Sequence, residues 1–186
     1  MIDAKPQSFI SEHFILEDSH ELQNKIILKV GDHSIVNPQV RVRTQPGSAS
    51  NNSDKPPVLE IGNYSIISDR CSFELTPILP VVIGNYTYID PGVRVEPGVT
   101  IGDFCELGAG CVIGRKSRIG NNCKIAAGAK VDGNTTIPSR SVAVGRTGDI
   151  HAAGDDGGDD HRKREMKMHV DFLMRTMPLY GKAHSK

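Results

Sequence analysis

Aliphatic residues recur at every sixth position through the middle of the chain. From Ile83 onward the series continues as Ile89, Val95, Ile101, Leu107, Ile113, Ile119, Ile125, Val131 and Ile137. The same spacing occurs upstream, at Val30, Val36 and Val42 and again at Ile61, Ile67 and Phe73. A small or β-branched residue follows four positions after most of these, and glycine often follows directly. This period predicts very short strands joined by tight corners, with the aliphatic and small side chains pointing inward.

A longer period of 18 residues lies on top of the shorter one. The related hexads IGNYTY, IGDFCE and IGNNCK begin at Ile83, Ile101 and Ile119, and IGNYSI at Ile61 belongs to the same set. Three distinct hexads per cycle indicate three faces per coil. We therefore predict an all-β solenoid, a left-handed parallel β-helix of hexapeptide repeats with about six triangular coils, spanning roughly 24 Å. The left hand comes from the resemblance to known hexapeptide coils and not from the spacing.

Breaks in the period and shifts in composition divide the chain. The expected parts are an N-terminal cap or extension at 1–23, the β-helix at 24–146 with loops at 43–60 and 74–82, a Gly/Asp-rich linker at 147–160, a helix at 161–178 and a tail at 179–186. Both loops follow a hexad of the third face, so they should leave from one corner. They are either binding features or tolerated surface insertions.

The C-terminal segment has the spacing of an amphipathic helix. Its apolar face consists of Met166, Val170, Leu173, Met174 and Met177. Sixteen residues of helix are roughly 24 Å long, which matches the predicted height of the solenoid. We expect this helix to pack along the β-helix, although a helix that binds a partner has the same pattern.

Outward residues three positions after the first-face aliphatic residues should stack as a ladder. They are His33, Tyr64, Tyr86, Phe104, Asn122 and Arg140. Three of them are aromatic, and an exposed apolar patch of this kind usually covers something. The ladder is therefore a candidate packing or partner face, for the C-terminal helix or for a second subunit.

Composition excludes several classes of function. Lys plus Arg and Asp plus Glu are both 22, so the chain lacks the excess of a strongly basic nucleic-acid binder. No apolar run is long enough for direct membrane insertion, and the acidic N-terminal stretch argues against a secretory signal. Four cysteines occupy inward positions and are expected to be buried thiols of a reducing compartment: Cys71, Cys105, Cys111 and Cys123.

Histidine is absent from most of the repeats, because none of the seven lies between residues 34 and 150. Hexapeptide acyltransferases use a coil histidine as general base, and the related carbonic anhydrases bind zinc through three histidines. On this ground we expect no catalytic, cofactor-binding or metal-binding residues and no cofactor. The prediction is that the chain is not an enzyme.

The segment VDFLMRTMPLY at 170–180, following a coil with few histidines and an acidic spacer, resembles the dynactin subunit 6 family, the smaller hexapeptide subunits of the dynactin pointed-end complex. The resemblance implies a non-catalytic adaptor that pairs with dynactin subunit 5 and other pointed-end subunits, and indirectly with dynein and cargo adaptors. It implies a cytoplasmic, cytoskeleton-associated protein that supports cargo transport along microtubules. The alternative is a hexapeptide-repeat enzyme, an acyltransferase or a carbonic-anhydrase-like homotrimer.

Overall fold

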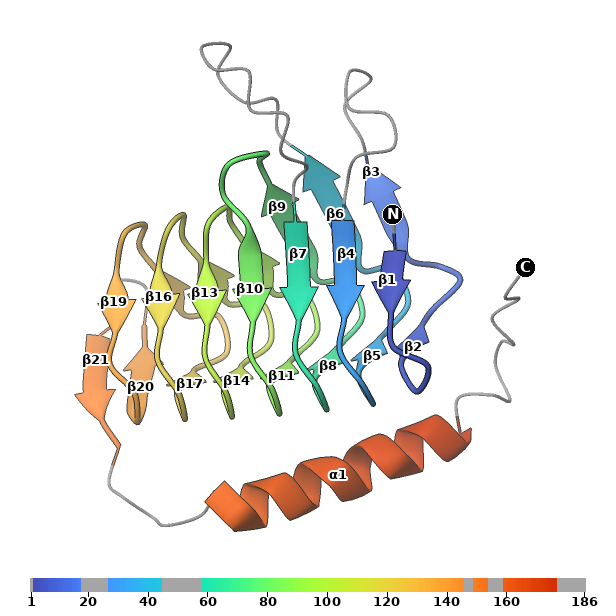
Figure 1. The fold of residues 1–186 in the computed structure, drawn as a ribbon. Helices are drawn as coiled ribbons and strands as arrows, with labels where there is room; N and C mark the ends of the chain where they lie inside the picture. The colour runs from blue at the N-terminus through green and yellow to red at the C-terminus, as the bar shows by residue number, and fades with distance from the viewer. Residues whose placement is uncertain (1, 18–26, 45–57, 146–148, 154–158, 177–186) are drawn as a thin grey trace.

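Three parallel sheets form the sides of a solenoid in the computed structural model, which describes residues 2–17, 27–44, 58–145, 149–153 and 159–176 (Figure 1). The predicted fold class is confirmed: the chain is a left-handed parallel β-helix with one C-terminal helix along it. The chain visits the first, second and third faces in turn, and the third face has six strands. There are thus six complete coils and part of a seventh.

The first face contains β1 (Ile2–Ala4), β4 (Ile27–Val30), β7 (Val58–Ile61), β10 (Val81–Ile83), β13 (Thr100–Ile101), β16 (Arg118–Ile119) and β19 (Thr136–Ile137). The second face contains β2 (Phe9–Ile10), β5 (Ile35–Val36), β8 (Ile66–Ile67), β11 (Tyr88–Ile89), β14 (Glu106–Leu107), β17 (Lys124–Ile125), β20 (Ser141–Val144) and the antiparallel β21 (Asp149–Ala152). The third face contains β3 (Ile15–Glu17), β6 (Arg41–Thr44), β9 (Ser72–Leu75), β12 (Arg94–Val95), β15 (Val112–Ile113) and β18 (Lys130–Val131). In the regular coils each residue pairs with the one 18 positions later, as Ile101 does with Ile119, so the longer period is the length of one coil.

The N-terminal segment forms a coil of its own. Strands β1, β2 and β3 pair with β4, β5 and β6, so residues 2–17 are the first coil of the solenoid, where the sequence suggested only a cap or extension. Ala4, Ile10 and Leu16 are in register with Val30, Val36 and Val42, and they too lie six residues apart. The spacing was hidden because Ala4 is small and no glycine follows these positions.

The two interruptions of the period both follow third-face strands, as expected. The first lies between β6 and β7, and residues 45–57 of it are outside the described residues. The second is a tight turn between β9 and β10, closed by a bridge between Thr76 and Leu79.

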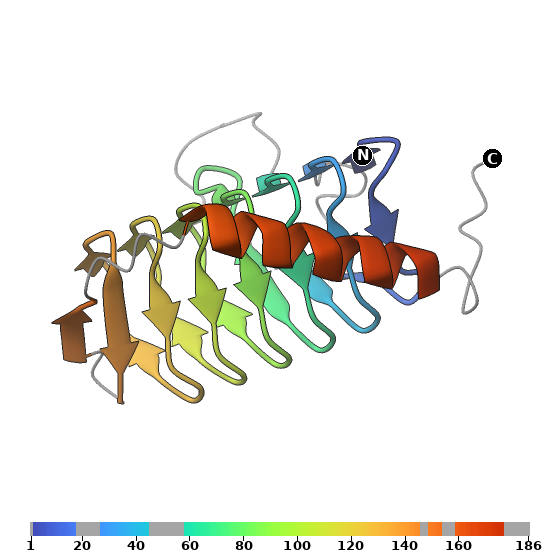
Figure 2. The ribbon, with the colours of Figure 1, turned by 90° about the horizontal axis from the view of Figure 1, so that it is seen from below.

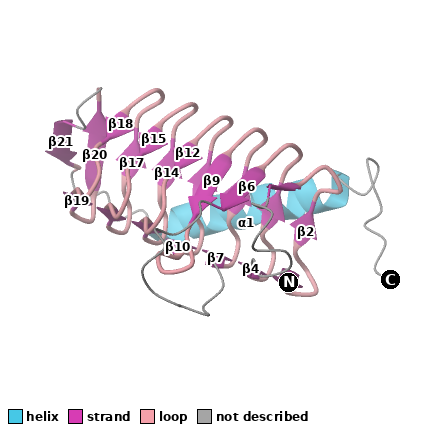
Figure 3. Cartoon of the chain, turned by 90° about the horizontal axis from the view of Figure 1, so that it is seen from above, coloured by secondary structure: helices cyan, strands magenta, loops and turns pink. Residues whose placement is uncertain are grey.

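The segment expected to be a linker contains a strand. β21 pairs antiparallel with β20 and so covers the edge of the second face at the last coil. The helix α1 (Asp159–Thr176) begins two residues before the predicted start, and Met177 and the predicted tail lie outside the described residues. Figure 2 shows α1 running beside the coils from the last toward the first, and Figure 3 shows the strands repeating from coil to coil.

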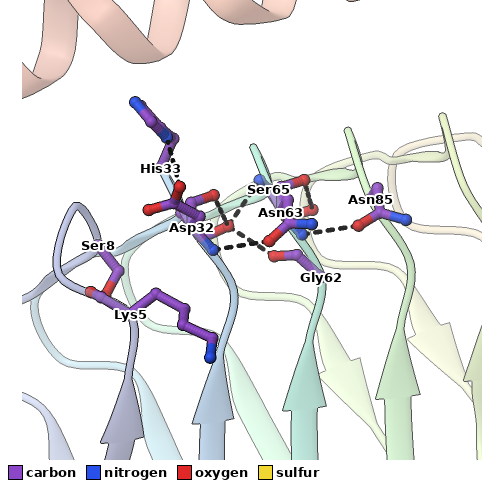
Figure 4. Close-up of polar contacts among 9 residues, drawn as sticks. Lys5, Ser8, Asp32, His33, Gly62, Asn63, Ser65 and Asn85 are labelled. Atoms are coloured by element: carbon purple, nitrogen blue, oxygen red, sulfur yellow. Dashed lines mark hydrogen bonds and ion pairs between the residues drawn. The ribbon is translucent and has the colours of Figure 1, made fainter.

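The corner between the first and second faces brings successive backbones very close together. A Cβ added to Gly62 would lie 2.6 Å from the carbonyl carbon of Gly84, so only glycine fits there. Beside the glycines, the Asp32 N–H donates to Asn63 Oδ1 at 2.7 Å and the Asn63 N–H donates to Asn85 Oδ1 at 2.8 Å (Figure 4). These side-chain acceptors satisfy backbone donors that the short strands leave unpaired.

Small polar and sulfur-containing side chains line the inner side of the same corner. Ser34 Oγ donates to the Gly62 carbonyl at 2.6 Å, and Ser65 Oγ donates to the Gly84 carbonyl at 2.8 Å. The Cys105 thiol donates to the Gly120 carbonyl in the same way, at 3.0 Å. At the corner between the first and second faces, backbone contacts, side-chain hydrogen bonds and close packing therefore hold neighbouring coils together.

All four cysteines are buried and none of them forms a disulfide bond, as the sequence predicted. Burial raises the pKa of Cys71 to about 12 and the pKa of Cys111 to about 12. The hydrogen bond with Cys123, and then burial, raise the pKa of Cys105. These thiols serve as small packing groups in the core.

The glycine corner gives a prediction for stability. Replacing Gly62→Ala should lower the free energy of unfolding by about 2–3 kcal/mol, because the new methyl group meets backbone atoms of the next coil. Gly133→Ala is the matched control: its Cβ would have the Arg115 carbonyl oxygen as nearest atom, at 3.2 Å, and should cost less than about 1 kcal/mol. Thermal unfolding followed by circular dichroism checks the difference; equal losses in the two variants would contradict it.

The raised thiol pKa values give a second prediction. Alkylation by iodoacetamide at pH 8, mapped by mass spectrometry, should leave Cys71 and Cys111 unmodified in the folded chain and modify both in urea, because a pKa of about 12 leaves almost no thiolate. Because the pKa of both thiols in the folded chain lies above the usual value of 9.0, their contribution to the free energy of unfolding should be complete below about pH 9 and be lost as the pH rises toward 12. Rapid modification of either cysteine in the folded chain would show that the core is open to solvent.

Candidate functional site

The ladder predicted from the sequence runs along the corner between the first and second faces, and its four rings, from His33 to Phe104, form a continuous stack. All six of its residues have left-handed backbone conformations, with φ between 54° and 59°. The rings of His33 and Tyr64 are 4.7 Å apart, those of Tyr64 and Tyr86 are 5.2 Å apart, and those of Tyr86 and Phe104 are 5.0 Å apart. The rings are nearly parallel because the same backbone conformation recurs once per coil.

Helix α1 packs against this ladder and the second face. Val170 is fully buried and forms a cluster with Ile35 and Ile66, which point outward from β5 and β8. Met166, Leu173 and Met174 are partly buried against the same cluster, whereas Met177 lies outside the described residues. The structure thus places the predicted apolar face of the helix on the chain's own solenoid.

Two lysines of α1 lie over the ladder itself. Lys167 Nζ is 5.3 Å from the centre of the Tyr64 ring, and Lys163 Nζ is 5.6 Å from the centre of the Phe104 ring. An ammonium group over an aromatic face is attracted by the ring quadrupole. The ladder is therefore partly covered by α1 as far as Phe104.

Around and beyond Phe104, the helix and the coils enclose a groove of about 740 Å³. The ladder contributes Tyr86, Phe104, Asn122 and Arg140; the second face contributes Tyr88, Glu106, Lys124 and Val142; the segment after β21 contributes Ala153; and α1 contributes Arg162, Glu165, Met166, Met168 and His169. Cys105 and Cys123 also line it. Of the six predicted ladder residues, Tyr86, Phe104, Asn122 and Arg140 line this groove, whereas His33 and Tyr64 do not.

Helix α1 brings a histidine to the groove. The ring of His169 is 5.9 Å from the ring of Tyr88, and the two planes are tilted by 38°. Opposite, Lys124 Nζ is 2.9 Å from Glu106 Oε1, so these two charges hold each other on neighbouring coils. Histidine is the side chain best suited to take and release protons near neutral pH. The groove therefore combines a proton acceptor, fixed charges and aromatic walls.

His169 was not among the predicted site residues, because histidine was expected to act only from within the repeats. His169 lies three residues after Met166 and directly before Val170, so it borders the stripe that docks on the coils. From the sequence, His169 lies beside the apolar face of the helix, and this was a usable signal. Whether its side chain reaches a groove depends on which face of the solenoid the helix covers. His161, on the same helix, instead lies 3.1 Å from Glu165 Oε1.

In the part of the chain that the structure describes, no group of three or more His, Cys, Asp or Glu residues is placed to hold a metal ion. Within the same residues, no helix has the length and apolar character needed to cross a membrane.

Comparisons with known proteins agree on the architecture. A family model described as bacterial transferase hexapeptide (six repeats) matches residues 80–115. A hexapeptide transferase family protein from Anaplasma phagocytophilum superposes with a TM-score of 0.69 at 15% identity, covering 94% of this chain and 91% of that one. A Bacillus cereus protein named as a candidate acetyltransferase superposes with a TM-score of 0.70 at 18% identity, covering 96% and 92%. No curated protein matches the chain significantly. At these identities the likeness shows the fold.

The comparisons contradict the function predicted from the resemblance of residues 170–180. We expected a non-catalytic adaptor subunit of dynactin, but the two chains described above, which superpose over more than 90% of their length, are named as transferases, and neither they nor the matching family model points to dynactin, dynein or microtubule transport. The prediction that the chain is not an enzyme is wrong for the same reason. That prediction depended on the absence of histidine from most of the coils, whereas a histidine can also come from α1.

The docking of α1 can be tested by truncating its most buried side chain. Val170→Ala should lower the free energy of unfolding by about 1–3 kcal/mol, because it opens a cavity against Ile35 and Ile66. Phe172→Ala removes a larger side chain that is 64% exposed and should change stability by less than about 0.5 kcal/mol. Urea unfolding of the two variants checks this ranking, which would be wrong if the exposed phenylalanine proved the more important residue.

Proposed function

We propose that this chain is an acyltransferase that moves an acyl group from a thioester donor to an amine or hydroxyl acceptor in the groove beneath α1. The observation that carries the proposal is the position of His169, which borders a groove of about 740 Å³ built on a hexapeptide-repeat coil. The names of the two similar structures support the reaction class. This is the alternative that the sequence left open.

Acyl transfer from a thioester needs one proton to be moved. The acceptor nitrogen or oxygen attacks the thioester carbonyl, its proton goes to a base, and the departing thiolate takes up that proton as the carbon–sulfur bond breaks. His169 is the base in this proposal, because its ring lies at the groove and faces Tyr88. A positioned general base typically accelerates such a step by about 10²–10⁴-fold.

The remaining residues of the groove would position the two substrates. Lys124 is held by Glu106, and Arg140 and Arg162 come from the coil and from the helix. Cationic side chains that line a groove favour a donor that carries negative charge. Tyr86, Tyr88 and Phe104 supply the apolar wall that excludes water from the thioester.

Two expectations from the resemblance of residues 170–180 stay predictions. They are the pairing with dynactin subunit 5, its pointed-end partners, dynein and cargo adaptors, and the cytoplasmic, cytoskeleton-associated location. None of the described contacts tests either of them.

Thiol release measures the proposed reaction directly. The purified chain is incubated with acetyl-CoA and a panel of amino sugars, amino acids and polyamines, and free thiol is followed with a chromogenic disulfide. We expect release with at least one acceptor, and a kcat at least 100-fold lower in His169→Ala with little change in KM for the donor.

His161→Ala is the matched control, because it removes a histidine from the same helix whose side chain is 71% exposed and pairs with Glu165. Its kcat should equal that of the unchanged chain. Unaltered release in His169→Ala would remove the assigned base. Failure to bind acetyl-CoA in equilibrium dialysis, with no release for any acceptor, would overturn the proposed function.

A further inference from the structure

The turn between β9 and β10 presents apolar residues to solvent. Residues 76–80 read TPILP, and a bridge between Thr76 and Leu79 closes the turn. Ile78 lies at its tip and is 63% exposed. A single exposed isoleucine is ordinary on a protein surface, so the neighbours of this turn decide whether it belongs to a binding surface.

The turn projects from the corner between the third and first faces, on the side of the solenoid away from α1 (Figure 1). Helix α1 packs on the second face, where Val170 meets Ile35 and Ile66. The groove beneath α1 and the apolar turn therefore lie on different sides of the molecule. A partner that covers the turn would leave the groove open.

Leu79 connects the turn to the corners of the following coils. A Cβ added to Gly98 would lie 3.3 Å from Leu79 Cβ and 3.3 Å from Lys116 Cγ, so the side chains of Leu79 and Lys116 flank this glycine. The Lys116 N–H donates to the Pro97 carbonyl at 3.0 Å, which stacks its corner on the one before it. The apolar turn therefore lies next to a lysine.

More cations follow on the same coils. The segments 94–100, 112–118 and 130–136 stack on one another, and each runs from the third face around the corner to the first face. Their two carboxylates belong to Glu96 and Asp132. Their five cations are all exposed, and among the described residues none of these five side chains forms an ion pair: Arg94, Arg115, Lys116, Arg118 and Lys130.

The nearby carboxylates do not cancel this charge. Glu96 Oε2 accepts the Arg115 backbone N–H at 2.9 Å, so it serves the corner itself. Glu74, on the other side of the turn, is half-buried and in register with Arg43. Because the whole chain has a net charge of zero, the excess of positive charge is a local feature of this corner.

We propose that the corner between the third and first faces binds the surface of an anionic lipid bilayer. Ile78, with Leu79 behind it, enters the boundary between headgroups and acyl chains, and the cations of the following coils lie against the headgroups. The contact reaches only the interfacial region, so it needs no apolar run that spans the bilayer.

A bilayer suits both features of the corner, whereas other polyanions suit one. A nucleic acid would neutralise the cations but would leave Ile78 in water. It would also lack rings to stack on, since none of the described exposed residues of this corner is aromatic. An acidic protein would pair with the cations, but protein interfaces have an apolar core larger than one protruding isoleucine.

Vesicle flotation tests the proposal. The purified chain is mixed with phosphatidylcholine vesicles that contain either no phosphatidylserine or about 30% of it, and the bound fraction is measured against lipid concentration. The unchanged chain should bind the anionic vesicles at least about tenfold more tightly than the neutral ones. Raising the salt to about 0.5 M should release most of the chain, because salt screens exposed charges.

Two pairs of matched variants assign the contact to the corner. Ile78→Ser and Arg118→Gln should each weaken binding to the anionic vesicles by about fivefold or more. Phe172→Ser and Arg175→Gln make the same kinds of change at exposed positions of α1 and should bind as the unchanged chain does. Because all four side chains are exposed, the melting temperatures of the variants should equal that of the unchanged chain.

Three results would overturn the proposal. The first is no binding to anionic vesicles at millimolar lipid, which would leave the turn to a protein partner. The second is weaker binding in Arg118→Gln with none of the loss in Ile78→Ser, which would reduce the corner to a general anion surface. The third is an equal loss in the α1 variants, which would place the lipid contact on the helix.

Discussion

The close approach of successive coils at the glycine corner is the constraint on which the rest of the molecule depends. At Gly62 the next backbone leaves room for a hydrogen atom and nothing larger. The neighbouring Asn63 N–H is bound by Asn85 Oδ1 of the next coil, at 2.8 Å. Sterics and hydrogen bonding therefore select one register for the coils that carry this glycine, from Gly31 to Gly120. The outward side chains therefore also repeat in position once per coil, although their contacts do not determine the register.

Because the inward residues set the register, the outward positions can hold different residue types. These outward residues differ between the early and the late coils. On the second face the early strands present Ile35 and Ile66, which bury Val170 of the helix. The later strands present Glu106 and Lys124, which bind each other across neighbouring coils. The helix therefore packs tightly over the early coils and leaves a groove over the later ones.

The sequence predicts the solenoid well because the physical cause is local and repeated. Inward aliphatic residues recur six positions apart, and the four cysteines follow as buried members of the same pattern. The first coil was missed because Ala4 and Leu16 keep the spacing without the glycine that marks later coils. Strand β21 was missed because its Gly- and Asp-rich surroundings resemble a linker. The predicted function was wrong because it depended on a short resemblance at residues 170–180.

The candidate site was beyond reach of the repeat pattern for a geometric reason. The outward side chains of one face of a β-helix lie side by side on a nearly flat surface, whereas a small-molecule site needs a concave one. A second element must supply the missing wall, and here α1 does so. Chemistry in such a groove is divided between residues far apart in the sequence, with Glu106 and Lys124 on the coils and His169 on the helix. A search for catalytic residues within the repeats alone examines one wall of the site, so a coil with few histidines is not evidence against catalysis.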